Sequence, residues 1–135
     1  DVVFDTVESP LCLNTAPNGL VCASPDYYLA RNVDRIPLSA KLFAHDSHCM
    51  VNLKSKTMAV VERDTGRRIV VDIADFPYTL IWSTPQEPMR FICIEPWHSI
   101  PSEDNGPIEW EKKPCAASLA PNEMWQTTLN MTFER

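Results

Sequence analysis

The chain has 135 residues, of which 44% are apolar and 22% are charged, and its formal net charge is −6. This composition is typical of one globular domain, and the longest apolar run is far shorter than the roughly 20 residues that a membrane-spanning helix needs. The basic residues form no cluster longer than a pair. We therefore expect neither nucleic acid nor a membrane as a partner.

Strands separated by turns are the predicted secondary structure. Twelve prolines and only three glycines argue against long helices. Short β-rich runs are predicted at residues 2–7, 11–13, 20–23, 49–53 and 57–62, and a single helical turn is predicted within residues 36–43.

The segment that follows has the pattern of a β-hairpin. Its first arm ends at residues 60–63, the turn is Asp64-Thr65-Gly66, and the second arm is residues 68–73. Beyond it, two continuous apolar runs at residues 78–82 and 91–94 are typical of strands that are buried on both faces.

The last predicted strand, residues 124–133, alternates cleanly between two faces. One face has the set Met124, Gln126, Thr128, Asn130 and Thr132, and the other has Trp125, Thr127, Leu129, Met131 and Phe133. The second set is the more apolar, so we expect it to meet the core. The pattern as a whole predicts an all-β protein, an antiparallel β-sandwich or part of one.

The cysteines indicate the redox compartment. Their number is odd, their spacing is wide and no Cys-x-x-Cys pair occurs; they are Cys12, Cys22, Cys49, Cys93 and Cys115. This pattern argues against a zinc site and against a disulfide framework. We expect five buried thiols in a reducing compartment, and hence a cytoplasmic protein.

Glu95 is the first candidate for chemistry. In a strand, Phe91, Cys93 and Glu95 would point to one face, so a carboxylate would follow two apolar side chains at the mouth of the sheet. A carboxylate in apolar surroundings is suited to act as a general base. Trp97 follows after Pro96 turns the chain, and its ring offers a flat wall for the C–H faces of a sugar. The alternative is a strand-end Glu that simply points to water.

The cluster His45-Asp46-Ser47-His48-Cys49 is the second candidate. Two imidazoles and a carboxylate could bind a metal, but they lack the usual ligand spacing, so a solvated loop is the preferred interpretation. Asp46 by itself is suited to accept hydrogen bonds from ligand hydroxyl groups.

Several motifs, taken together, resemble a known family. They are Ile-Pro-Leu-Ser at 36–39, Leu-Phe at 42–43, Asp46, Asn-Leu-Lys-Ser at 52–55, Phe-Pro-Tyr-Thr-Leu-Ile-Trp-Ser at 76–83, Phe-Ile-Cys-Ile-Glu-Pro-Trp-His at 91–98 and Leu-Ala-Pro-Asn-Glu at 119–123. In this order and spacing, from about residue 26 to the C-terminus, they resemble the C-terminal part of the aldose 1-epimerase (galactose mutarotase) family, in a divergent bacterial branch.

The resemblance implies a large β-sandwich that interconverts the α and β anomers of a free aldose, a monosaccharide such as a hexose. Glu95 matches the family's general base, which takes the proton of the anomeric hydroxyl group. Asp46, Trp97 and His98 would contact the substrate. The family requires no metal and no organic cofactor.

The same resemblance implies that the site is incomplete. The family's acid is a His in a segment before the point where this chain starts, and no His precedes His45. We therefore expect residues 1–135 to be the C-terminal portion of one mutarotase-like domain, inactive without its N-terminal half. The alternatives are a non-catalytic carbohydrate-binding β-sandwich module and a purely structural domain of a larger enzyme.

Overall fold

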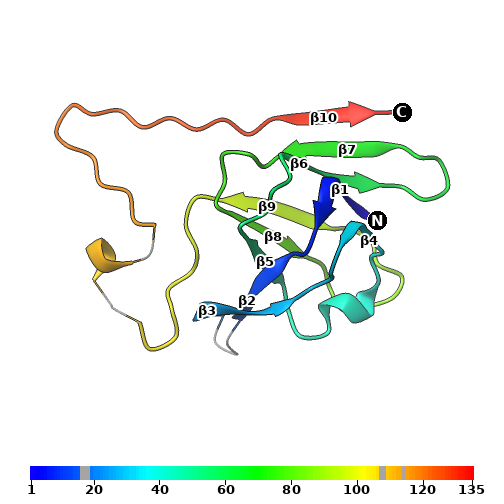
Figure 1. The fold of residues 1–135 in the computed structure, drawn as a ribbon, viewed down its shortest axis with the longest axis horizontal. Helices are drawn as coiled ribbons and strands as arrows, with labels where there is room; N and C mark the ends of the chain where they lie inside the picture. Colours follow the sequence, from blue (N-terminus) through cyan, green and yellow to red (C-terminus); the bar gives the residue numbers. More distant parts are fainter. Residues whose placement is uncertain (16–18, 107–108, 114) are drawn as a thin grey trace.

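The structure is a computed structural model that describes residues 1–15, 19–106, 109–113 and 115–135, except the side chains of residues 23–26. These residues form ten strands and two short 3₁₀ helices (Figure 1). The elements are β1 (Val2–Glu8), β2 (Leu11–Thr15), β3 (Val21–Tyr28), β4 (Val33–Ile36), η1 (Ala40–Phe43), β5 (His48–Val51), β6 (Thr57–Val61), β7 (Arg68–Asp72), β8 (Tyr78–Trp82), β9 (Cys93–Trp97), η2 (Trp110–Lys112) and β10 (Met131–Glu134). The predicted all-β fold class is confirmed.

Two antiparallel sheets of five strands each make up the fold. The first sheet has the order β10-β7-β6-β1-β4, and the second has the order β3-β2-β5-β8-β9. Buried side chains from both sheets, and from η1 and adjoining loop residues, form one cluster between the sheets: Val2, Phe4, Cys12, Ile36, Leu38, Phe43, Met50, Met58, Val71, Ile73 and Ile81. The removal of these apolar side chains from water, worth about 25 cal/mol per Å², is the main stabilising term of the sandwich.

The predicted hairpin is confirmed. β6 and β7 pair with Val61 opposite Arg68, and the Gly66 amide donates to the Glu62 carbonyl at 2.9 Å. Gly66 has a φ of +75°, a conformation that costs glycine little and other residues more. The helical turn predicted within residues 36–43 is also present, as η1.

The two strands predicted to be buried on both faces differ from each other. β8 is buried at its three central residues, as predicted. The prediction for residues 91–94 is wrong, because Phe91 is exposed, the strand begins at Cys93, and all five of its residues are half-buried. Pro96 and Trp97 also lie within β9 and do not turn the chain. Pro96 is compatible with this position because β9 is the last strand of its sheet, where a missing N–H group can face away from the ladder.

The predicted C-terminal strand is shorter than expected. Only β10 pairs, with β7, whereas residues 124–130 lie outside any strand. The expectation that the apolar set of this segment meets the core is wrong for this chain: Trp125, Leu129, Met131 and Phe133 are exposed. In Figure 1 the described parts of the segment between β9 and β10 swing away from the sheets before β10 returns beside β7.

The cysteines also differ from the expectation. All five are free, but only Cys12 and Cys49 are buried, Cys22 and Cys93 are half-buried, and Cys115 is exposed. The prediction of five buried thiols is therefore wrong for three of them, because Cys22 and Cys93 lie on the end strands of the second sheet and Cys115 lies in the exposed segment before β10. Among the described residues, no helix is long and apolar enough to cross a lipid bilayer.

Candidate functional site

The second sheet has two apolar faces. Side chains alternate along each strand, so Cys12, Met50 and Ile81 point into the core between the sheets. Their neighbours in sequence, Leu13, Cys49, Val51 and Leu80, point the other way. Together with Val21 and Ile100 they form a second buried cluster on the outer face. These side chains are covered by the protein itself, so the part of the outer face that a ligand can reach is its half-buried β9 end.

Glu95 lies at the end of one row of this outer face. Residues directly opposite each other in an antiparallel pair project to the same face. Leu13 is opposite Cys49, Cys49 is opposite Leu80, and Leu80 is opposite Glu95. The Glu95 carboxylate thus ends a row of three apolar side chains, and it is half-buried.

Aromatic side chains flank Glu95 on the same face. Tyr78 is opposite Trp97, and Trp82 is opposite Cys93, so both pairs are neighbours of the pair Leu80–Glu95. Diagonal neighbours of this kind lie about 7–8 Å apart, within reach of long and aromatic side chains. Aromatic rings beside a carboxylate form a surface that is apolar on its faces and accepts hydrogen bonds at one point.

The Glu95 carboxylate is not engaged by other groups: across the described residues, it takes part in no hydrogen bond or ion pair. Its charge nevertheless reaches a neighbour. The pKa of the Cys93 thiol is raised, first by burial and then by the negative charge of Glu95. A carboxylate without protein partners, held on a sheet beside aromatic rings, can accept a proton from a ligand.

His98 borders two cavities, and Trp97 borders one of them. A cavity of about 420 Å³ is lined by Trp97, His98 and neighbouring residues. A second one, of about 560 Å³, lies between His98 and the C-terminal segment with Trp125. The His98 Nε2 atom is 2.7 Å from the Thr127 hydroxyl oxygen, and the ring centroid of Trp125 is 5.0 Å from that of His98. His98 therefore connects the end of β9 to the segment that precedes β10.

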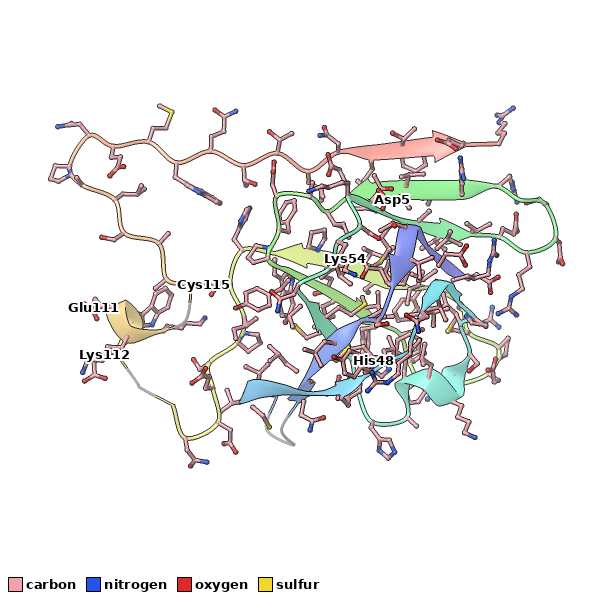
Figure 2. The ribbon with its side chains drawn as sticks, in the orientation of Figure 1. Asp5, His48, Lys54, Glu111, Lys112 and Cys115 are labelled. Atoms are coloured by element: carbon pink, nitrogen blue, oxygen red, sulfur yellow. The ribbon has the colours of Figure 1, made fainter. Side chains whose placement is uncertain are left out.

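Tyr78 is a site residue that the sequence interpretation did not single out. Its hydroxyl oxygen is 3.2 Å from the Cys115 sulfur. This hydrogen bond, with burial as the second cause, raises the pKa of Tyr78 to about 12, so the phenol stays protonated and can donate a hydrogen bond. Figure 2 shows Cys115 on the extended segment, beyond the edge of the sheets. A sequence signal for this face exists: Tyr78, Leu80 and Trp82 alternate along one strand in the same way as Cys93, Glu95 and Trp97 alternate along the next.

Asp46 lies apart from Glu95. It is exposed and precedes β5, and its Oδ1 atom accepts a hydrogen bond from the Ser47 amide at 2.6 Å. His48, two residues later, is level with Ile94 across two strand pairs. Asp46 is therefore two strand spacings from Glu95 across the sheet and about three residues from it along the strand direction. These two offsets correspond to a separation of roughly 10–15 Å. The sheet therefore brings Trp97 and Glu95 together, but not Asp46.

His48 is a structural residue. Its Nδ1 atom is 2.8 Å from the Tyr27 hydroxyl oxygen, and its Nε2 atom is 2.7 Å from the Leu42 carbonyl oxygen. These partners assign a neutral ring whose Nε2–H donates to Leu42 and whose Nδ1 accepts from Tyr27. Burial lowers the pKa of His48, although the Leu42 hydrogen bond and the Asp46 charge raise it in part. Figure 2 shows His48 within the body of the molecule.

The described residues contain no group of three or more His, Cys, Asp and Glu side chains that could hold a metal ion. The His45-to-Cys49 segment is divided among different environments: His45 and Asp46 are exposed, His48 is bonded within the protein, and Cys49 is buried on the outer face. Burial raises the pKa of Cys49 to about 11, so this thiol stays protonated.

Comparisons with known proteins give relatives that are longer than this chain. No protein-family model matches it. The plasmid and chromosomal forms of protein LacX from Lactococcus lactis subsp. lactis are each 29% identical to it over 132 residues, which is 96% of this chain and 44% of theirs. The chain thus spans less than half the length of the curated relatives that it matches.

Two crystal structures share the fold. One is a galactose mutarotase-like protein from Lactobacillus casei, with a TM-score of 0.82 and 22% identity, covering 98% of this chain and 46% of that one. The other is a galactose mutarotase related enzyme from Lactobacillus acidophilus, with a TM-score of 0.80 and 22% identity, covering 99% of this chain and 44% of that one. The chain therefore has a partial galactose mutarotase-like fold.

Proposed function

We propose that this chain is the part of an aldose 1-epimerase that supplies the general base, and that the base is Glu95. The observation that carries the proposal is the position of Glu95 at the end of the row Leu13–Cys49–Leu80, half-buried and without a protein partner among the described residues. The partial galactose mutarotase-like fold and the similarity to LacX support it.

Glu95 would act as a base and then as an acid. Its carboxylate takes the proton of the anomeric hydroxyl group while the bond between C1 and the ring oxygen breaks, and the ring oxygen receives a proton from a separate acid. The open-chain aldehyde then rotates about the C1–C2 bond. Reclosure returns both protons and gives the other anomer, so the reaction needs no oxidant, metal or organic cofactor.

The remaining proposed contacts are with the substrate. Trp97, with Tyr78 across the strand pair, offers ring faces to the C–H groups of the sugar. His98 follows Trp97 and borders both cavities, from where its ring can bind a hydroxyl group. Asp46 would accept hydrogen bonds from hydroxyl groups, but at roughly 10–15 Å from Glu95 it can contact only the far side of the substrate.

We assign the acid to a part of the protein outside these 135 residues. His48 faces the core and is bonded through both ring nitrogens, and we assign His98 to binding of a substrate hydroxyl group and not to the acid. Since mutarotation needs an acid and a base across the ring, the 135-residue chain alone should not accelerate anomer exchange.

The test is polarimetry on the full-length protein with α-D-glucose and α-D-galactose. We expect rapid anomer exchange, and a loss of about 10²–10⁴-fold in Glu95→Gln, the range for removal of a general acid–base group. Asp34→Asn is the matched control, because Asp34 is an exposed carboxylate on β4 of the other sheet. A folded protein that gives no acceleration over buffer with any aldose would refute the epimerase assignment.

A non-catalytic carbohydrate-binding module is the second candidate function. The observation that favours it is that the described residues combine an aromatic, apolar face with a hydrogen-bond acceptor, which is sufficient for sugar binding without an acid. Calorimetric binding of a hexose, weakened in Trp97→Ala and without anomer exchange in the full-length protein, would select this function. A purely structural role predicts that Glu95→Gln changes neither binding nor rate.

A further inference from the structure

Three apolar side chains of the first sheet form an uncovered strip: Ile69, Met131 and Phe133. Met131 is opposite Val71, a buried core residue, and Phe133 is opposite Ile69. Opposite residues share a face, so the strip lies on the face of the first sheet that forms the core. Its members are nevertheless 40%, 55% and 73% exposed, respectively.

The strip is uncovered because the two sheets do not end together. The second sheet ends at β9, which has no further strand partner among the described residues, whereas the first sheet continues to β10 (Figure 1). A cavity of about 400 Å³ lies at this place. Its lining combines three apolar residues in one row, Val60, Ile69 and Phe133, with five charged residues.

The sequence of this segment is that of a covered strand. Trp125, Leu129, Met131 and Phe133 follow the alternation of a face that meets apolar neighbours. Large apolar side chains in such a continuous line on an open surface mark an interaction site. An unpaired strand edge beside them, here that of β9, can accept a further strand.

We propose that the strip is the docking surface for a β-strand from the remainder of the same protein, which pairs with the free edge of β9 and covers Ile69, Met131 and Phe133. The length of the relatives favours this occupant. The match covers 98% of this chain but only 46% of the Lactobacillus casei protein, so the fold of that protein contains further residues that could supply the strand. Pro96 has no N–H group to offer, so the new ladder uses residues 93–95 of β9.

The docked strand would place Glu95 in the interior of the second sheet. Backbone on both sides then fixes the strand that bears the carboxylate, and side chains of the added strand border it. The docking itself does not depend on the proposed epimerase activity, because it rests on the register of β10 and β7 and on the exposure of the strip.

The experiment compares the isolated 135-residue chain with the full-length gene product, using Met131→Lys and its matched control Thr132→Lys. Thr132 is the next residue of β10, is exposed, and points to the opposite face. We expect Met131→Lys to lower the melting temperature of the full-length protein by roughly 10 °C and to change that of the isolated chain by less than about 2 °C. Thr132→Lys should have little effect on either protein.

Hydrogen exchange provides the second readout. We expect those amides of residues 93–95 that point away from β8 to exchange slowly in the full-length protein and rapidly in the isolated chain, since a ladder bond protects an amide. Equal exchange in the two proteins, or equal effects of the two lysine substitutions, would overturn the proposal. The isolated chain could instead form a concentration-dependent dimer that Met131→Lys abolishes, while the melting temperature of the full-length protein stays unchanged. This result would assign the strip to a second copy of the chain and would also overturn the proposal.

Discussion

The Tyr78 hydroxyl oxygen lies 3.2 Å from the Cys115 sulfur, and this contact connects the face that bears Glu95 to the segment that leads to β10. The two residues are 37 positions apart in the chain. The contact gives the Cys115 side chain a specific role at the border of the candidate site, although the thiol itself is exposed.

Replacement of Cys115 by Ala should lower the pKa of Tyr78. The hydrogen bond to Cys115 is the largest cause of the rise to about 12, and burial remains after the substitution, so the value should fall toward the ordinary 10 without reaching it. Ultraviolet titration of tyrosinate absorbance measures the change, and Tyr78→Phe identifies the transition. An unchanged titration curve in Cys115→Ala would contradict the contact.

Removal of the Glu95 charge should make Cys93 more reactive. Burial and the negative charge of Glu95 both raise the pKa of the Cys93 thiol, so Glu95→Gln lowers it and increases the thiolate fraction at pH 8. We expect Cys93 to react roughly twofold to threefold faster with an aromatic disulfide reagent, a range consistent with a half-exposed charge pair. Cys93→Ser identifies the kinetic phase. An equal rate in both proteins would mean that the two side chains do not share a face.

Loss of the Glu8 carboxylate should destabilise the chain. Glu8 is buried, and its Oε1 atom accepts hydrogen bonds from the Lys54 and Ser55 amides at 2.7 and 2.6 Å. Glu8→Ala leaves both amides without a partner, at a cost of about 1–3 kcal/mol for each group. Glu8→Gln keeps a hydrogen-bond acceptor for the two amides, so its free energy of unfolding should fall much less than that of Glu8→Ala. Urea denaturation of both variants makes the comparison, and equal losses would show that the amides find other partners.

His48 should make stability fall at acidic pH. Its pKa is lowered in the folded state from the ordinary 6.5, so between these two values the unfolded chain binds a proton that the folded chain does not. The stability that the neutral His48 contributes to the folded state is therefore fully present above about pH 6.5. It is lost as the pH falls toward the pKa of His48 in the folded state. The free energy of unfolding, measured in urea from pH 8 to pH 5, should show this decrease, and His48→Gln should reduce it. The same slope in both proteins would exclude His48 as the cause.

Local patterns predicted those parts of the fold that depend on neighbouring residues. The β6–β7 hairpin follows from a turn with glycine between two β-rich arms, and β8 follows from an apolar run. The boundaries of β9 could not be read this way. Ser83 donates a hydrogen bond to the Phe91 carbonyl oxygen at 2.7 Å, and the edge position of β9 admits Pro96. Neither fact is visible in residues 91–97 alone.

The candidate site was predictable only in part. The alternation of residues 91–97 placed Cys93 and Glu95 on one face, and the register agrees because both lie opposite outer-face residues of β8. The same rule predicted the core-facing side of residues 125–133, but whether that side is covered depends on strands that these residues do not contain. The Tyr78–Cys115 contact depends on the path of the chain over 37 residues, which no local pattern encodes.

Ile94 lies between Cys93 and Glu95 and packs on the opposite face, against the core cluster. One short strand thus has the proposed base on one side and a core side chain on the other. Substitutions that repack the core around Ile94 would therefore also shift the position of the carboxylate, and substitutions beside Glu95 would alter the melting temperature. At β9, the position of the proposed base and the packing of the core are therefore not independent of each other.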